Sequence, residues 1–271
     1  MPEMPEVETI GRQLGQALKG KKIERVLVSL PGMVKASLGK FKKAVKGAKI
    51  EGVERRAKLL FIKLSGGNYL VIHLKLSGQL IFNGEVGKHS HIVYSFTDGS
   101  CLIHNDLRKF GFVKLISEKD LGNFFDEMNF GPEPLDKSFS FNLFKERIEK
   151  RKKSVIKTLL MDQKFIAGIG NIYACEILFS AGVLPDRKAG TLKEKEAKAI
   201  YEAIKEILSL ALRKKGSSDR DYLDAYGRKG GYMPLAKVYQ REGEDCRVCG
   251  EKIKRVKTGS RSSYFCPRCQ R

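Results

Sequence analysis

The chain has 271 residues, of which 42% are hydrophobic and 9% aromatic, and its formal net charge is +21. This composition excludes a mostly disordered protein, and the length is sufficient for two domains that each have a core. The excess of Lys and Arg favours a polyanionic partner, and the absence of an apolar run near the roughly 20 residues of a membrane span makes nucleic acid the expected one.

The chain opens with Met-Pro-Glu-Met-Pro-Glu-Val-Glu, which has a chemical and a structural interpretation. If Met1 is removed, Pro2 becomes a secondary amine that can form a Schiff base, with Glu3 beside it as a proton donor or acceptor. In the structural interpretation, the prolines only begin a helix. That helix, which ends at Gly20, is predicted by the spacing of Val7, Ile10, Leu14 and Leu18. No signal peptide is recognised, so we expect a cytoplasmic protein.

Between residues 23 and 116 the pattern changes to short β-like runs separated by turn signals. Strands are predicted at residues 23–30, 59–64, 69–74, 91–96 and 112–116, with a helix near residues 40–45. We expect an antiparallel sandwich or barrel. Residues 130–135 have the composition of a linker.

The second half of the chain is predicted to be helical. Helical periodicity covers residues 141–151, 154–162, 171–181 and 192–214. The glycine-rich break before Asn171 can present backbone N–H groups to a phosphate. Residues 216–231 are polar and rich in glycine, and we expect a mobile loop there. Cys101 and Cys175 are expected to be reduced and buried.

The last four cysteines have the spacing C-x2-C-x16-C-x2-C, which predicts a tetrahedral structural zinc site. The ligands are Cys246, Cys249, Cys266 and Cys269. Because all four positions are supplied by protein, this single Zn²⁺ has no open position for catalysis. Residues 246–271 contain eight Lys or Arg and only one acid, Glu251, so we expect this ribbon to contact phosphates.

Together these motifs resemble the formamidopyrimidine-DNA glycosylase family, bacterial base-excision enzymes for oxidised purines, over nearly the whole chain. The resemblance is carried by Pro-Glu-Met-Pro-Glu-Val-Glu-Thr from Pro2, Arg-Arg-Ala-Lys from Arg55, Lys-His-Ser-His from Lys88, Asn-Asp-Leu-Arg-Lys-Phe-Gly from Asn105, Gly-Pro-Glu-Pro-Leu from Gly131, Ile-Ala-Gly-Ile-Gly-Asn-Ile-Tyr-Ala from Ile166, and the cysteine ribbon.

The resemblance implies an α+β fold with two domains. An N-terminal helix and an antiparallel β-sandwich would occupy residues 1–130 and a linker residues 131–137. A helix-two-turn-helix domain would follow at residues 138–237, with a zinc ribbon at 238–271. Double-stranded DNA with oxidised bases would bind between the domains of a monomer associated with the bacterial nucleoid.

The resemblance also implies a bifunctional glycosylase and AP lyase. Pro2 would attack C1′ of the damaged nucleoside, and the resulting Schiff base would permit β,δ-elimination. Glu3 would assist opening of the sugar ring, and Lys58 would bind a phosphate beside the lesion. Glu6 would lie at the lesion pocket, and Lys157 would line that pocket or the phosphate face. An ordinary role for Glu6 as a first-turn acid that suits the helix dipole is nearly as consistent with the sequence.

Phosphate contacts are implied for His73, His91, Asn171 and Arg261. Taken alone, a histidine in the position of His73 is more often a hydrogen-bonded core residue than a ligand-binding one. A wedge that fills the space left by an extruded base is implied for Leu76, Arg108 and Phe110, where leucine replaces the family's methionine. Residues 217–232 would form the lesion-recognition loop.

Two other functions are consistent with the sequence. An endonuclease VIII-like enzyme would prefer oxidised pyrimidines, but those proteins usually have Gly where Met4 stands and Tyr-Leu where Ile172-Tyr173 stands. A non-catalytic protein that binds lesion DNA would share the charge and the ribbon, yet it would have no need of Pro2, Glu3 and Lys58 together.

Overall fold

The computed structural model describes residues 1–271 and separates them into two compact units. Unit 1 comprises Met1–Met128 and Leu212–Met233, and unit 2 comprises Asn129–Ala211 and Pro234–Arg271. The contacts therefore group Leu212–Met233 with the N-terminal unit, although the sequence places it in the helical domain. None of the helices is both long and apolar enough to cross a membrane.

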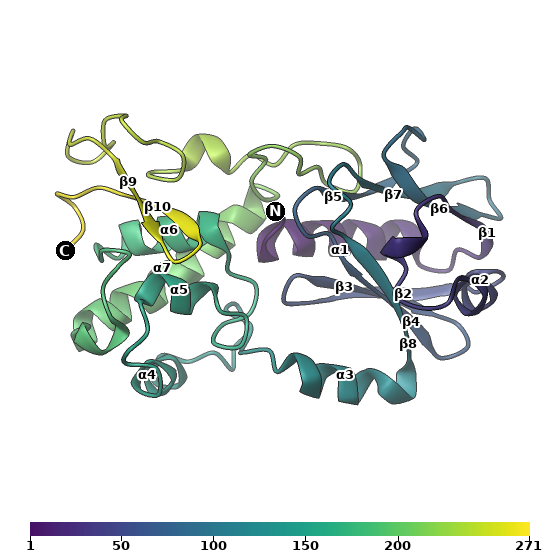
Figure 1. Cartoon of the computed structure of the whole chain (residues 1–271), viewed down its shortest axis with the longest axis horizontal. Helices are drawn as coiled ribbons and strands as arrows, with labels where there is room; N and C mark the ends of the chain where they lie inside the picture. Colours follow the sequence, from purple (N-terminus) through teal and green to yellow (C-terminus); the bar gives the residue numbers. More distant parts are fainter. The chain divides into compact units, whose positions relative to one another are not determined.

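Unit 1 is built on two four-stranded antiparallel sheets, as the sequence predicts. One sheet has the order β1 (Ile23–Val28), β6 (Ser90–Phe96), β7 (Cys101–Asp106), β5 (Gly78–Phe82). The other has the order β2 (Ile50–Arg56), β3 (Leu59–Leu64), β4 (Asn68–His73), β8 (Phe112–Ser117). Figure 1 shows the N-terminal helix α1 (Met4–Leu18) lying between these two sheets.

The apolar face of α1 explains its position. Its predicted stripe of Val7, Ile10, Leu14 and Leu18 is buried in one core cluster with side chains from both sheets. α1 contacts β2 and β3 on one side and β5 on the other. The remaining short elements of this unit are η1 (Pro31–Met33), α2 (Leu38–Val45), η2 (Glu118–Asp120) and α3 (Leu121–Met128). The helix carrying the candidate nucleophile is thus fixed by burial on both sides.

The rest of the chain, mostly unit 2, is helical and ends in a two-stranded ribbon. Its elements are α4 (Phe141–Glu149), α5 (Ile156–Met161), α6 (Asn171–Ser180), η3 (Ala189–Thr191), α7 (Glu194–Arg213), η4 (Met233–Leu235), β9 (Lys254–Thr258) and β10 (Arg261–Phe265). Every residue of α6 from Ile172 to Phe179 is buried, and all of them except Glu176 are apolar or aromatic. A helix of this kind belongs at the centre of a bundle.

His104 on β7 predicts how acid destabilises the protein. Its ring is fully buried, and neither ring nitrogen has a hydrogen-bond partner. Burial lowers the pKa of His104 to about 4. Between pH 6.5 and 4, His104 is protonated in the unfolded chain but remains neutral in the folded chain. The free energy of unfolding therefore falls as the pH falls through this window.

We expect His104→Leu to remove part of this pH dependence. Between pH 7 and pH 5 the wild-type chain should lose about 2 kcal/mol more unfolding free energy than the variant. Urea unfolding followed by circular dichroism at both pH values measures the difference. An identical loss in the two proteins would show that His104 does not contribute.

Candidate functional site

The first turn of α1 is fixed by a reciprocal capping box. The Glu3 backbone N–H donates to Oε2 of Glu6 at 2.7 Å, and the Glu3 side chain accepts a bond from the Glu6 backbone N–H. Pro2, Glu3 and Glu6 are all buried, whereas Met1 is 42% exposed. The Glu3 carboxylate is therefore held next to Pro2, and Met1 stays accessible for removal.

Glu6 also joins the helix to the loop that follows α7. Its Oε1 accepts bonds from the backbone N–H of Ser217 at 2.7 Å and from the Ser217 hydroxyl at 3.1 Å. Gly216 has φ +85°, and a Cβ there would lie 2.7 Å from the same oxygen. The backbone conformation favours glycine at this position, and a Cβ there would displace the Glu6 carboxylate that binds Ser217.

The loop over residues 217–232 is docked on the sandwich. Gln13 of α1 donates to Asp224 at 2.8 Å and accepts from the backbone N–H of Ala225 at 2.9 Å. Gln79 of β5 donates to the backbone oxygen of Asp221 at 2.6 Å. Two loop residues enter the main core cluster: Tyr222 and Ala225. The sequence predicts a mobile loop because the segment is mostly polar, and its composition does not show that Tyr222 and Ala225 are buried in the core.

Lys58 stands in the two-residue turn between β2 and β3. Ala57, the other turn residue, has φ 54°. Arg55 supports the turn, since it donates to the Ala57 oxygen at 3.0 Å and to Glu8 of α1 at 2.6 Å. These bonds join the turn to α1, and they fix the backbone that carries the buried Lys58 side chain.

His73, at the end of β4, is a neutral N–H donor. Its Nδ1 accepts the backbone N–H of Lys75 at 3.0 Å, so the ring proton lies on Nε2. Burial first, and then the positive charges of Lys75 and Lys58, lower the pKa of His73 to about 3. The ring can therefore donate from Nε2 at neutral pH without carrying a charge.

The predicted wedge residues lie on two turns of unit 1. Leu76 is in the turn between β4 and β5, and Arg108 and Phe110 are in the turn between β7 and β8. Phe110 is 56% exposed, and the Arg108 guanidinium lies 5.3 Å from the centre of its ring. An exposed aromatic ring beside a cation can stack on a base.

Asp106 joins the two wedge turns. Its fully buried carboxylate accepts from the Ser77 hydroxyl at 2.6 Å, from the Arg108 backbone N–H at 3.2 Å and from the Gly111 backbone N–H at 2.6 Å. His91, for which the sequence predicts a phosphate contact, is buried with Nε2 2.9 Å from the Asp106 backbone oxygen. Nε2 of His91 therefore already has a hydrogen-bond partner within the sandwich.

Replacing Asp106 with Ala should destabilise unit 1 strongly. The change leaves buried N–H and O–H donors without acceptors, and we expect the unfolding free energy to fall by about 3 kcal/mol. Urea unfolding with circular dichroism measures this loss. The matched control is Asp126→Ala, at an exposed carboxylate on α3, which should change stability by less than about 0.5 kcal/mol. Equal effects in the two variants would contradict the assigned role of Asp106.

In unit 2, Asn171 begins α6 after a turn ordered by Gln163. Gln163 donates to the Ile169 oxygen at 2.9 Å and accepts from the Gly168 backbone N–H at 2.8 Å. The side-chain oxygen of Asn171 is buried without a hydrogen-bond partner. An unpaired polar atom at a helix N-terminus is a candidate ligand-binding group.

Lys157 connects α5 to the ribbon. Its fully buried ammonium donates to the Ser262 backbone oxygen at 2.7 Å and to the Ser263 hydroxyl at 2.8 Å. Arg261, the exposed first residue of β10, directly precedes these partners. The structure thus places Lys157 among the residues that hold the Arg261 hairpin, where the sequence leaves open a position at the lesion pocket or at the phosphate face.

The four predicted zinc ligands are brought together in unit 2. Their sulfur atoms all lie within 4.8 Å of one another, and two pairs are 3.9 Å and 3.4 Å apart. Zn–S bonds of 2.3 Å in a tetrahedron would require separations of about 3.8 Å. The residues therefore fit one structural Zn²⁺ ion, held by Cys246, Cys249, Cys266 and Cys269.

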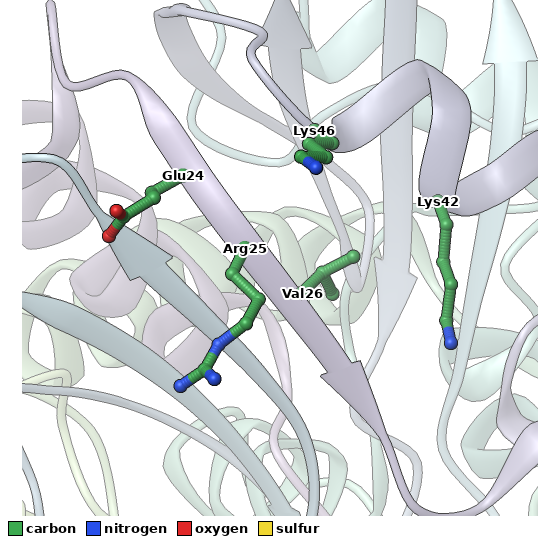
Figure 2. Close-up of a pocket in the computed structure, with 5 residues that line it drawn as sticks. All are labelled: Glu24, Arg25, Val26, Lys42 and Lys46. Carbon is green, nitrogen blue, oxygen red and sulfur yellow. The ribbon is translucent and has the colours of Figure 1, made fainter.

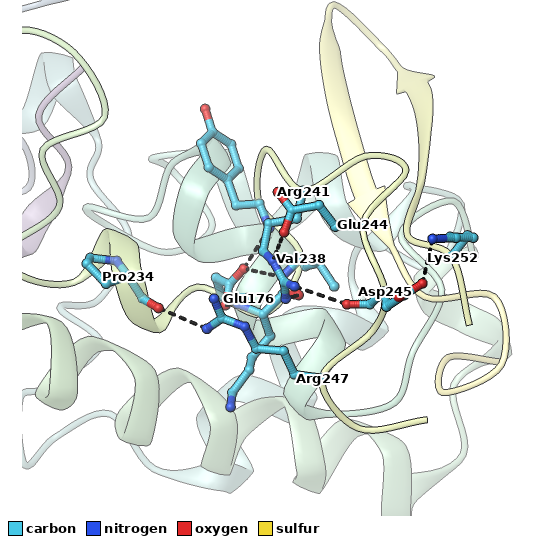
Figure 3. Close-up of polar contacts among 10 residues, drawn as sticks. Glu176, Pro234, Val238, Arg241, Glu244, Asp245, Arg247 and Lys252 are labelled. Atoms are coloured by element: carbon cyan, nitrogen blue, oxygen red, sulfur yellow. Dashed lines mark hydrogen bonds and ion pairs between the residues drawn. The ribbon is translucent and has the colours of Figure 1, made fainter. Parts of the chain in front are cut away.

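A buried carboxylate anchors the segment that enters the ribbon. Glu176 of α6 accepts backbone N–H bonds from Lys237 at 2.7 Å, Val238 at 3.0 Å and Tyr239 at 2.8 Å (Figure 3). Burial raises the pKa of Glu176, against the effect of these three donors. Cys175 packs beside the zinc ligands in a small core, as expected for a buried thiol, whereas Cys101 is only partly buried.

Three family models match successive parts of the chain. Residues 1–113 match the formamidopyrimidine-DNA glycosylase N-terminal domain, and residues 130–222 match the H2TH domain of the same enzymes. Residues 243–271 match the zinc finger found in FPG and IleRS. The order of these matches agrees with the predicted order of N-terminal domain, helical region and ribbon.

Whole proteins with this arrangement are similar along their full length. Formamidopyrimidine-DNA glycosylase of Pelotomaculum thermopropionicum is 40% identical over 275 residues, covering 100% of this chain and 99% of the relative. The Lactococcus lactis Fpg complex with abasic-site DNA has a TM-score of 0.93 at 35% identity, covering 99% of both chains. MutM in complex with carbocyclic 8-oxo-G DNA gives the same score and identity over 100% of both chains. The chain belongs to the formamidopyrimidine-DNA glycosylase family and is an enzyme of that family.

Proposed function

We propose that this enzyme removes oxidised purines from double-stranded DNA and cleaves the strand at the resulting abasic site, with the Pro2 amine as nucleophile. The capping box carries the proposal, because it fixes Glu3, the neighbour of the buried Pro2, at the N-terminus of α1. Two solved relatives are complexes, one with DNA that contains an abasic site and one with DNA that contains carbocyclic 8-oxo-G, and both support this substrate class.

The reaction begins when the unprotonated Pro2 nitrogen bonds to C1′ and the glycosidic C1′–N bond breaks. The departing base takes the bonding electron pair and a proton. Glu3 then donates a proton to the ring oxygen of the sugar, which opens as the Schiff base forms. The positively charged imine withdraws electrons, so protons can leave the sugar and the phosphates on both sides can be eliminated. Removal of Met1 must precede every step.

The DNA backbone would be held by groups that the structure makes suitable donors. His73 offers a neutral Nε2–H, Asn171 stands at a helix N-terminus, and Arg261 is exposed on an anchored hairpin. Lys58 would neutralise a phosphate next to His73, to which it already lies close enough to affect the pKa. Leu76, Arg108 and Phe110 would fill the space of the extruded base.

The contacts of Glu6 with Ser217 place one end of the 217–232 loop at the helix that carries Pro2. We propose that this loop contacts the extruded base and that Glu6 belongs to the lesion pocket. We further propose that the protein acts as a monomer in the bacterial cytoplasm, associated with the nucleoid, as its net charge of +21 favours.

Oxidised pyrimidines are the alternative substrate class, and Met4 with Ile172-Tyr173 favours purines. Single-turnover cleavage of two duplexes that differ only in the lesion separates the classes. We expect 8-oxoguanine to be cleaved at least about tenfold faster than thymine glycol. Faster cleavage of thymine glycol would assign the enzyme to the pyrimidine class.

A further inference from the structure

A groove lies between the edge strand β1 and helix α2 in unit 1. Its cavity has a volume of about 640 Å³ and is lined by Glu24, Arg25, Val26, Lys42 and Lys46. Figure 2 shows Val26 pointing from β1 toward α2, with Lys42 and Lys46 projecting beside it. None of the wedge, capping-box or zinc residues lines this groove.

The outer edge of β1 is open to another strand. β6 is its only neighbour in the sheet, and the bonds that Ile23 makes with Gly47 and Ala48 cover only the beginning of that edge. Because Ser29 donates to His91 on the β6 side, alternation turns the N–H and C=O of Val26 and Val28 outward. Such an edge can pair with an extended backbone.

The charges at the groove are unbalanced. Arg25, Lys42 and Lys46 are exposed, and none forms an ion pair, whereas Glu24 is the only carboxylate in the lining. Leu27 of β1 is 50% exposed, so the same strand offers apolar surface. An occupant that pairs with β1 should therefore present acidic side chains toward α2.

We propose that this groove binds an extended acidic segment of a partner protein by adding a strand to β1. Alternate acidic residues of that segment face Lys42 and Lys46, and its backbone bonds to Val26 and Val28. A polyphosphate backbone fits less well, because it makes no use of the strand edge and meets the Glu24 carboxylate. The proposal concerns a surface separate from the proposed chemistry, so either can fail without the other.

The test uses the full chain and an acetylated peptide of alternating Asp and Val, as long as β1. We expect the peptide to shift the NMR signals of the Val26 and Val28 amides. The double variant Lys42→Glu, Lys46→Glu should bind at least about tenfold more weakly. The matched control is Lys195→Glu, Lys198→Glu, which changes the net charge equally at two exposed lysines of α7 and should bind as the wild type does.

A peptide N-methylated at every second residue tests the backbone pairing, and we expect it to lose binding. Equal weakening in both double variants would reduce the interaction to nonspecific charge and overturn the proposal. Unchanged binding of the N-methylated peptide, or no shift at Val26 and Val28, would also overturn it. If duplex DNA displaces the peptide and shifts the same amides, the groove is a DNA contact instead.

Discussion

Inserting Leu between Met1 and Pro2 should abolish strand cleavage while lesion binding persists. Aminopeptidases remove Met1 only before a small residue, so the insertion retains Met1 and keeps the Pro2 nitrogen in an amide bond. An amide has no nucleophilic lone pair, and we expect the single-turnover rate on 8-oxoguanine DNA to fall by a factor on the order of 10³ or more. Gel assays of cleavage and fluorescence anisotropy of binding measure the two effects separately.

Two comparisons make this result interpretable. The wild-type protein, shown by N-terminal mass analysis to begin at Pro2, provides the reference. Pro2→Gly keeps a free primary amine once Met1 is removed. Its single-turnover cleavage rate should therefore lie between that of the reference and that of the blocked protein. Cleavage by the blocked protein at the reference rate would remove Pro2 from the mechanism.

Replacing Cys266 with Ser should disable the ribbon. The variant loses one of four thiolates, so zinc content should fall below the single ion expected for the wild type. The hairpin that carries Arg261 then loses its support, and we expect DNA affinity to fall at least about a hundredfold, with a shallower dependence on salt because fewer phosphates are neutralised. Zinc analysis and anisotropy titrations over a range of salt concentrations test this.

Cys101→Ser is the matched control, because this free thiol is only partly buried and lies in unit 1. It should retain zinc, affinity and salt dependence. If Cys266→Ser also retains them, the four sulfurs do not form the structural metal site. Loss of affinity in both variants would point to a general effect of removing a thiol.

The sequence predicts those parts of the fold that have regular periodicity. The stripe on α1 and the apolar runs at β3 and β4 are found where they are predicted. β2 is missed because Gly52 and four charged residues interrupt its pattern. β5 is missed because it has five residues and begins with Gly78-Gln79, and β7 because its second half, from His104 to Asp106, is polar. These strands form because they pair with neighbours distant in the sequence, which local patterns do not report.

The residues of the candidate site likewise fall into those that local sequence patterns indicate and those that depend on the tertiary fold. Pro2, Glu3 and the four cysteines are recognisable because their chemistry depends on local spacing. Asp106 and Gln13 are missed, since their roles exist only once turns far apart in the chain meet. The only local signal that could have indicated the Asp106 contacts is its position within the Asn-Asp-Leu-Arg motif, because the burial of its carboxylate is not visible in the sequence.

Borohydride trapping shows directly whether the Pro2 nitrogen forms a Schiff base with the DNA. Protein shown to begin at Pro2 is mixed with duplex DNA containing 8-oxoguanine and reduced during turnover. We expect a covalent protein–DNA adduct whose peptide map places the bond on the Pro2 nitrogen. No adduct, or an adduct at a lysine such as Lys58 with Pro2 unmodified, would contradict it.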